Sequence, residues 1–204
     1  STGSVTIHVY YMAADLLTKL PVTVQYPVSI YYRLLMPEIL RESADVVLYL
    51  DSDIICLERL PDFNNVDLTE KPVAAVKDVP RVAQERNMAL GLKHDSYFNS
   101  GVMLINTARW VDEKISEKVL AILDEKGASF TLMDQDALNL ALDGEAAILQ
   151  STWNMIYNLG QMTQYPEPGT LFLHYTGSIK PWRLSGRHPL SRYYRDCENR
   201  SPWA

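Results

Sequence analysis

The sequence predicts a single α/β domain built around a mostly parallel sheet. Short apolar runs are typical of buried strands, and amphipathic helical patterns separate them. No internal repeat or low-complexity linker divides the 204 residues, a length that fits one domain with a sizeable core. The domain is therefore expected to span residues 1–204, with 183–204 as a basic and aromatic C-terminal tail.

The first half of the chain predicts a strand, a helix and a second strand. Val5–Tyr10 has an alternating pattern and is rich in β-branched side chains, which predicts a strand. Tyr31–Arg41 has an apolar helical face, and Pro37 marks a short first segment or a kink. Val46–Leu50 is an apolar run bounded by charge, which predicts a strand covered on both faces.

The second half continues the alternation of strands and helices. Its expected elements are strands over Val73–Val76, Gly101–Asn106 and Thr170–Leu173, a helix between Glu113 and Glu125 stopped by Gly127, and a helix capped by Asp134. Asp78 lies just beyond the first of these strands, and His174 directly follows the last. Polar side chains therefore stand at several strand ends, where α/β sheets bind ligands.

The composition excludes several classes of protein. A formal net charge of −6 argues against a general nucleic-acid binder, because neutralising phosphates requires a clustered basic surface. Cys56 and Cys197 are too few for a disulfide framework and favour reduced thiols in the cytoplasm. No apolar run is long enough to cross a membrane. The sequence thus predicts a cytoplasmic globular protein.

Asp51 and Asp53 follow the predicted strand Val46–Leu50 directly. Two carboxylates spaced i, i+2 across a tight turn can reach one hard cation, and a cation held by few protein oxygens usually serves a phosphate. On spacing alone a solvated turn is the commoner case, because short acidic motifs match many unrelated sites. The metal interpretation therefore needs further ligands.

The loop that begins at His174 supplies candidates for these ligands. A neutral imidazole can join two carboxylates around Mn²⁺, and Lys180 could hold a phosphate as a point charge. Gly177 would allow close backbone approach to a ligand. A lone histidine after a strand is more often structural, so the prediction depends on these residues acting together.

Four blocks of the sequence, in this order, resemble glycosyltransferase family 8. They are Leu48–Asp53, Phe98–Asn106, Asp134–Asn139, and His174-x-x-Gly177-x-x-Lys180-Pro181-Trp182. Members of that family are retaining, nucleotide-sugar-dependent enzymes with the Rossmann-like GT-A fold. The resemblance covers the chain from about Tyr31 onward, and four ordered blocks are far more specific than one.

The resemblance implies a role for each matching residue. Asp51, Asp53 and His174 would bind a Mn²⁺ ion, with Mg²⁺ as the alternative. The ion would bridge to the diphosphate of UDP-glucose or UDP-galactose. Lys180 and Gly177 would contact that diphosphate. Arg33 would reach the donor sugar and the diphosphate region. The residues that match positions around the donor sugar are Asp78, Asn99, Asp134 and Gln135, of which Asp134 and Gln135 are the catalytic candidates.

Retention of configuration has two explanations. Gln135 would be the nucleophile of a double displacement, although an amide is a poor one. A same-face mechanism, in which the leaving phosphate takes the acceptor proton, needs no nucleophile and is the one we favour.

The C-terminal tail resembles the bacterial branch that adds hexoses to lipopolysaccharide cores. This implies a glycan or glycolipid acceptor. Basic residues such as Arg192 and Arg195, with nearby aromatic side chains, suit peripheral contact at the cytoplasmic face of the inner membrane.

Family members normally open with a βαβ segment that holds the base and ribose, and this chain shows no counterpart. The domain is therefore expected to be incomplete at its N-terminus. An exposed sheet edge would result, and such an edge favours a homo-oligomer.

Three other hypotheses compete with that of an active family 8 transferase. A truncated, inactive glycosyltransferase-like binding domain fits the missing segment. A haloacid-dehalogenase-like phosphatase also places Asp-x-Asp after a buried strand, but it requires Thr or Val soon afterwards, where this chain has Ile54, Ile55 and Cys56. A nucleotidyltransferase would need a glycine-rich N-terminal phosphate loop, which the sequence lacks.

Overall fold

The computed structural model describes residues 6–12, 17–24, 26–158, 165–183 and 189–202. These residues form a four-stranded and a three-stranded sheet. The larger sheet has the order β1 (Val46–Leu50), β4 (Phe98–Asn106), β3 (Val73–Lys77), β5 (Ala147–Leu149). The smaller sheet has the order β2 (Ile54–Cys56), β7 (Phe172–Thr176), β6 (Met155–Asn158).

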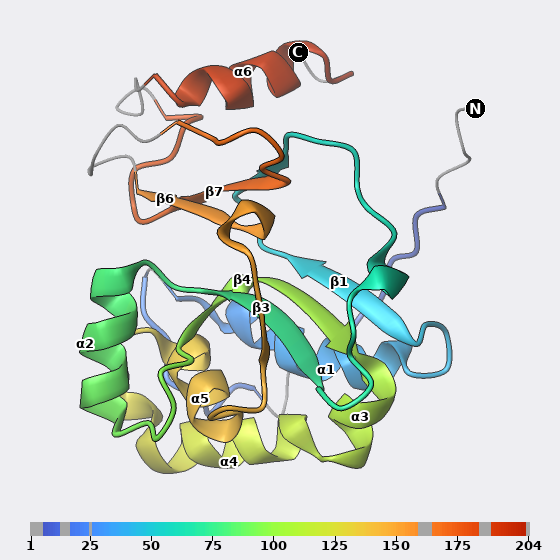
Figure 1. Ribbon diagram of the computed structural model, residues 1–204. Helices are drawn as coiled ribbons and strands as arrows, with labels where there is room; N and C mark the ends of the chain where they lie inside the picture. Colours follow the sequence, from blue (N-terminus) through green and yellow to red (C-terminus); the bar gives the residue numbers. More distant parts are fainter. Residues whose placement is uncertain (1–5, 13–16, 25, 159–164, 184–188, 203–204) are drawn as a thin grey trace.

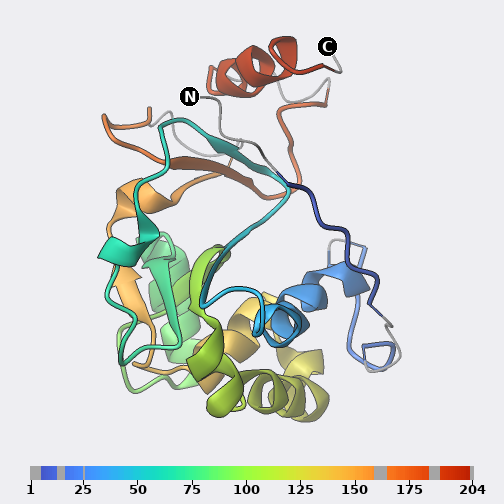
Figure 2. The same cartoon turned by 90° about the vertical axis from the view of Figure 1, so that its right-hand side faces the viewer.

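Helices cover the two sheets at opposite ends of the molecule. The α-helices are α1 (Tyr32–Leu40), α2 (Pro80–Leu90), α3 (Thr107–Asp112), α4 (Ile115–Lys126), α5 (Met133–Ala141) and α6 (Ser191–Asn199). Short 3-10 helices are η1 (Val28–Tyr31), η2 (Phe63–Asn65), η3 (Gly127–Ser129) and η4 (Ser151–Trp153). Figure 1 shows α6 over the small sheet and α3, α4 and α5 at the far end, and the turned view in Figure 2 agrees.

The main core lies between the large sheet and the helices α1, α3, α4 and α5. A buried polar contact joins three of these helices. Trp110 Nε1 donates to Ser116 Oγ at 2.9 Å, and the Ser116 hydroxyl donates to the Leu34 carbonyl at 2.6 Å. A smaller core under α6 contains Leu173, Tyr175 and Leu190.

The predicted α/β class is confirmed. Strands β1, β3 and β5 point the same way, as expected of a mostly parallel sheet, but β4 runs antiparallel between β1 and β3. Because β4 is reversed, its first residues lie beside the last residues of β1 and β3. The end of the sheet at which β1 and β3 finish therefore carries Asp51, Asp78 and the segment that starts at Phe98.

A register shift displaces the start of β4. Ala75 lies opposite Met103, yet Lys77 lies opposite Phe98, so β4 contains three more residues than β3 over this stretch. Such bulges bend a strand and redirect its side chains. Asn99 and Ser100 therefore leave the regular ladder with β3 at the edge where Asp51 and Asp78 lie.

Several predicted elements are confirmed with shifted ends. The helix α1 runs through Pro37 without ending there, and β4 begins at Phe98 rather than Gly101. Strand β1 is only half-buried, with Leu50 40% exposed, so the prediction of a strand covered on both faces was wrong.

Two other predictions were wrong. Whether a segment pairs as a strand, or a side chain caps a helix, depends on contacts that the local sequence pattern does not show. Residues 6–10 of the predicted strand Val5–Tyr10 form no strand in the described structure, and their side chains are exposed because no strand pairs with them; Val5 lies outside the described residues. Asp134 is the second residue of α5, and its side chain makes no cap. Within the described residues, no helix is long and apolar enough to cross a membrane.

Candidate metal and donor site

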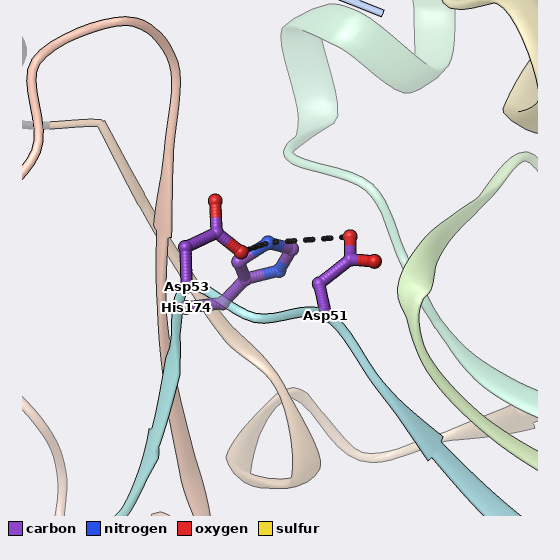
Figure 3. Close-up of side chains that lie close together, drawn as sticks. All are labelled: Asp51, Asp53 and His174. Carbon is purple, nitrogen blue, oxygen red and sulfur yellow. Dashed lines mark ion pairs between the residues drawn. The ribbon is translucent and has the colours of Figure 1, made fainter. Parts of the chain in front are cut away.

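Asp51, Asp53 and His174 come together where the chain passes from the large sheet to the small one (Figure 3). One ligand atom from each residue lies within 4.8 Å of the others. His174 Nε2 is 3.2 Å from Asp53 Oδ1 and 3.9 Å from Asp51 Oδ2. Structure and sequence thus agree that these three side chains form one group.

Backbone pairing brings them together. Asp51 N donates to the Gly101 carbonyl at 2.8 Å, which fixes the start of the turn on β4. Tyr175 N donates to the Asp53 carbonyl at 3.0 Å, and Ile54 pairs with His174. His174 is thus inside β7, the middle strand of the small sheet, and not beyond its end as predicted.

Because Gly101 has no side chain, the His174 ring can lie against the backbone at this position. A Cβ at this position would overlap His174 Cε1 and would lie 2.9 Å from both Asp51 Oδ2 and His174 Nδ1. Any larger residue would displace the imidazole or the carboxylate. Sequence reasoning missed this role, because it treated Gly101 only as the start of a strand.

Lys180 forms an ion pair with Asp53 of this group. Its Nζ lies 2.5 Å from Asp53 Oδ2 and donates to the Tyr175 carbonyl at 2.7 Å. Burial by itself raises the pKa of Asp53, but the interactions with His174 and Lys180 outweigh it and lower the pKa to about 2. Gly177 has φ +81°, a left-handed conformation that favours glycine and forms the turn between β7 and Lys180.

The geometry fits a divalent cation. Around an ion with bonds of about 2.1 Å, ligand atoms at right angles lie about 3 Å apart and opposite ones about 4.2 Å apart, and the 3.2 and 3.9 Å found here fall within this range. Among the described residues, Asp53 Oδ1 is buried and accepts no hydrogen bond. Two carboxylates with one imidazole suit Mn²⁺ and, less closely, Mg²⁺.

Arg33 links this cluster to the neighbouring one. Its guanidinium is buried, with Nη2 2.8 Å from Asp51 Oδ1 and Nε 3.1 Å from Asp134 Oδ2. Nη1 donates to the Ser100 carbonyl at 2.9 Å, and the guanidinium stacks 4.7 Å from the centre of the Tyr49 ring. Burial raises the pKa of Asp134 to about 6, although the Arg33 charge opposes the rise.

A second cluster contains Asp78, Asn99 and Gln135, all buried. Gln135 Nε2 donates to Asp78 Oδ2 at 2.9 Å, and Asn99 Nδ2 donates to the same oxygen at 3.2 Å. Gln135 Oε1 accepts from Asn99 Nδ2 and from Ser100 N, each at 3.1 Å. Ser100 therefore connects the two clusters, since its carbonyl accepts from Arg33.

A cavity of about 810 Å³ opens beside the second cluster, between α2 and the segment from β5 to β6. Asp78 and Asn154 form part of its wall, and Asn154 Nδ2 donates to Asn99 Oδ1 at 3.0 Å. Met88 and Ile148 line it with exposed apolar surface. Nothing in the sequence marked Asn154 or this cavity.

The sequence matches the profile of Glycosyl transferase family 8 over residues 6–186. It is 34% identical over 210 residues to a lipopolysaccharide 1,2-glucosyltransferase of Escherichia coli. It is 30% identical over 209 residues to a lipopolysaccharide 1,3-galactosyltransferase of Salmonella typhimurium. Both alignments cover 97% of this chain but 62% of the relative, so the chain spans less than two thirds of these relatives' length.

The fold is similar to that of the galactosyltransferase LgtC, whose crystal structure contains donor and acceptor sugar analogues. The TM-score is 0.77 at 22% sequence identity, over 92% of this chain and 73% of that one. This similarity confirms the predicted GT-A fold.

Proposed function

The chain belongs to glycosyltransferase family 8, and from this premise we propose that it acts as a metal-dependent retaining hexosyltransferase. Its donor would be UDP-glucose or UDP-galactose, and its acceptor the core oligosaccharide of lipopolysaccharide. The observation that carries the proposal is the group of Asp51, Asp53 and His174, with Lys180 beside it. Family membership also removes the support for a phosphatase or a nucleotidyltransferase.

Asp51, Asp53 and His174 would hold the metal ion, which when bound supplies a Lewis acid for the charge of the departing diphosphate. Lys180 adds a second positive charge at the same place. Because its Nζ lies 2.5 Å from Asp53, a phosphate next to the metal ligands is within its reach. These residues would stabilise the charge that develops when the bond to the sugar breaks.

The second cluster and Asp134 would orient the donor sugar. Asp78, Asn99 and Asp134 offer the carboxylate and amide groups that sugar hydroxyls need, and fixed orientation can contribute roughly 7 kcal/mol or more. Gln135 Oε1 already accepts hydrogen bonds from Asn99 and Ser100. A nucleophilic attack by this oxygen would have to break them, which favours the same-face mechanism.

The cavity beside Asp78 would receive the acceptor. It combines polar wall residues such as Lys77 and Gln84 with apolar surface, which suits a sugar ring that is stacked on one face and hydrogen-bonded at its edge. The acceptor's identity as lipopolysaccharide core is proposed from the names of the two relatives.

The proposal extends to a cytoplasmic location at the inner-membrane face. Arg192 and Arg195 on α6 are exposed, and Trp182, 46% exposed, packs against Tyr194 with ring centres 5.6 Å apart. Basic and aromatic residues of this kind suit an anionic lipid surface. Self-association through the edge strand β1 stays a prediction.

Transfer of labelled hexose from UDP-glucose and from UDP-galactose to purified lipopolysaccharide core tests the proposal. We expect Mn²⁺-dependent transfer from one donor, loss of transfer with EDTA, and loss in Asp53→Ala. Asp124→Ala removes an exposed carboxylate on α4 and should behave as the unaltered chain does. Equal transfer with EDTA, or transfer from neither donor, would refute the proposal.

A further inference from the structure

The Tyr97 hydroxyl lies between Gln135 and a buried carboxylate that the proposed mechanism does not use. Tyr97 and Asp136 are both fully buried. Tyr97 OH donates to Asp136 Oδ1 at 2.6 Å and accepts from Gln135 Nε2 at 3.2 Å. The three side chains thus form one hydrogen-bonded row that runs from Gln135 of the second cluster to Asp136.

The chemistry of these groups fixes the direction of each hydrogen bond. A carboxylate accepts only, so the Tyr97 proton is committed to Asp136 and the hydroxyl oxygen is left as an acceptor. Gln135 must then present its NH₂ group to Tyr97. On the other side of the amide, Ser100 N can only donate, so it requires Gln135 Oε1.

Side-chain and backbone donors hold both oxygens of the Asp136 carboxylate. Arg86 Nε and Nη2 donate to its two oxygens at 3.0 and 2.7 Å. The backbone N–H groups of Thr131 and Leu132 donate to Oδ2 at 3.0 and 2.9 Å. The carboxylate therefore connects α2, the start of α5 and the segment before β4, and it gives Tyr97 a fixed partner.

We propose that Tyr97, held by Asp136, is a positioning residue that fixes the orientation of the Gln135 amide and, through it, the Asp78 carboxylate. With the amide reversed, its oxygen would face both Asp78 and the Tyr97 lone pairs, and its NH₂ group would face Ser100 N–H. The existing orientation directs the second N–H of Gln135 at Asp78 Oδ2, 2.9 Å away. Together with Val79 N, which donates to Asp78 Oδ1 at 2.7 Å, and Asn99 Nδ2, this N–H holds Asp78 in one position on the cavity wall.

The kinetic consequence rests on the proposed function, but the structural one does not. Tyr97→Phe removes only the hydroxyl. Tyr31→Phe is the matched control, because Tyr31 is equally buried and its hydroxyl donates to the Pro21 carbonyl, which belongs to neither cluster.

Nuclear magnetic resonance of the Gln135 side-chain NH₂ group tests the structural part without any substrate. The signal is identified by its loss in Gln135→Ala. We expect solvent exchange of these protons to quicken by about 10-fold or more in Tyr97→Phe and to stay unchanged in Tyr31→Phe. An unchanged exchange rate in Tyr97→Phe would overturn the proposal.

Transfer kinetics test the consequence for catalysis. We expect Tyr97→Phe to lower kcat by about 10-fold while the donor KM changes less than about 2-fold, because a misoriented group affects the transition state more than binding. In a Gln135→Ala background, Tyr97→Phe should have no further effect. Additive losses would show that Tyr97 acts independently of Gln135 and would contradict the proposal. Absence of transfer by the unaltered chain would refute the proposed function instead, and the exchange measurement would still decide this inference.

Discussion

The replacement Gly101→Ala should disrupt the proposed metal site through one methyl group. The added Cβ would overlap His174 Cε1 and lie 2.9 Å from Asp51 Oδ2. Neither neighbour moves easily. His174 is in the middle strand of the small sheet, and Asp51 Oδ1 is held by Arg33 at 2.8 Å and by Tyr49 OH at 2.6 Å.

The magnitude follows from this crowding. Overpacking of a well-packed site costs about 1–3 kcal/mol, which for a chain of this size lowers Tm by roughly 2–12 °C. Because the displaced groups are the proposed ligands, we expect the affinity for Mn²⁺ to fall by about 10- to 100-fold, the loss typical when groups that hold metal ligands are changed.

Electron paramagnetic resonance of free Mn²⁺ measures this affinity, and thermal unfolding without metal measures stability. Gly91→Ala is the control: Gly91 has φ +65° and open space around it, so alanine there adds backbone strain but no contact with the site. It should lower Tm and leave Mn²⁺ affinity unchanged. Unaltered Mn²⁺ affinity in Gly101→Ala would refute the reasoning.

Three further predictions concern other parts of the structure. Lys180→Ala should keep Mn²⁺ affinity within about 3-fold, because it removes a cation that competes for Asp53, but should weaken UDP binding about 10-fold or more; calorimetry with each ligand checks both, and equal loss of both would contradict it. Ser116→Ala should destabilise the fold by about 1–3 kcal/mol in urea unfolding, since it leaves Trp110 Nε1 without its acceptor; a loss below about 0.5 kcal/mol would contradict this. Asp134 has a folded pKa of about 6, above its ordinary 3.8, so the folded state binds the extra proton and stability should fall as pH rises from about 4 to about 6, by roughly 1–3 kcal/mol, and then level off. Urea unfolding across this range should show the loss in the unaltered chain and not in Asp134→Asn; the same pH dependence in both would disprove it.

The sequence was sufficient wherever chemistry depended on residues close together in a strand-turn pattern. Asp51 and Asp53 were found because an apolar run ended at two carboxylates. Four ordered blocks added His174 and Lys180, and the structure brings all four side chains together. Local pattern and the ordered blocks together thus predicted that Asp51, Asp53, His174 and Lys180 form one group.

The remainder depended on contacts between distant segments. Asp134 looked like a helix cap, but it pairs with Arg33, which is about 100 positions earlier in the chain. The reversed direction of β4 has no signature in an apolar run, yet it decides which residues meet Asp51 and Asp78. The need for glycine at position 101 is explained only by the His174 ring, which occupies the space where a Cβ would lie. Each of these features can be predicted only when the residue or strand that it contacts is known.

Calorimetric titration of UDP into the chain, with and without Mn²⁺, tests most directly whether Asp51, Asp53 and His174 form a metal-diphosphate site. We predict UDP binding that depends on Mn²⁺ and disappears in Asp53→Ala, while Asp124→Ala binds as the unaltered chain does. UDP binding of equal strength without the metal, or retained in Asp53→Ala, would contradict the account.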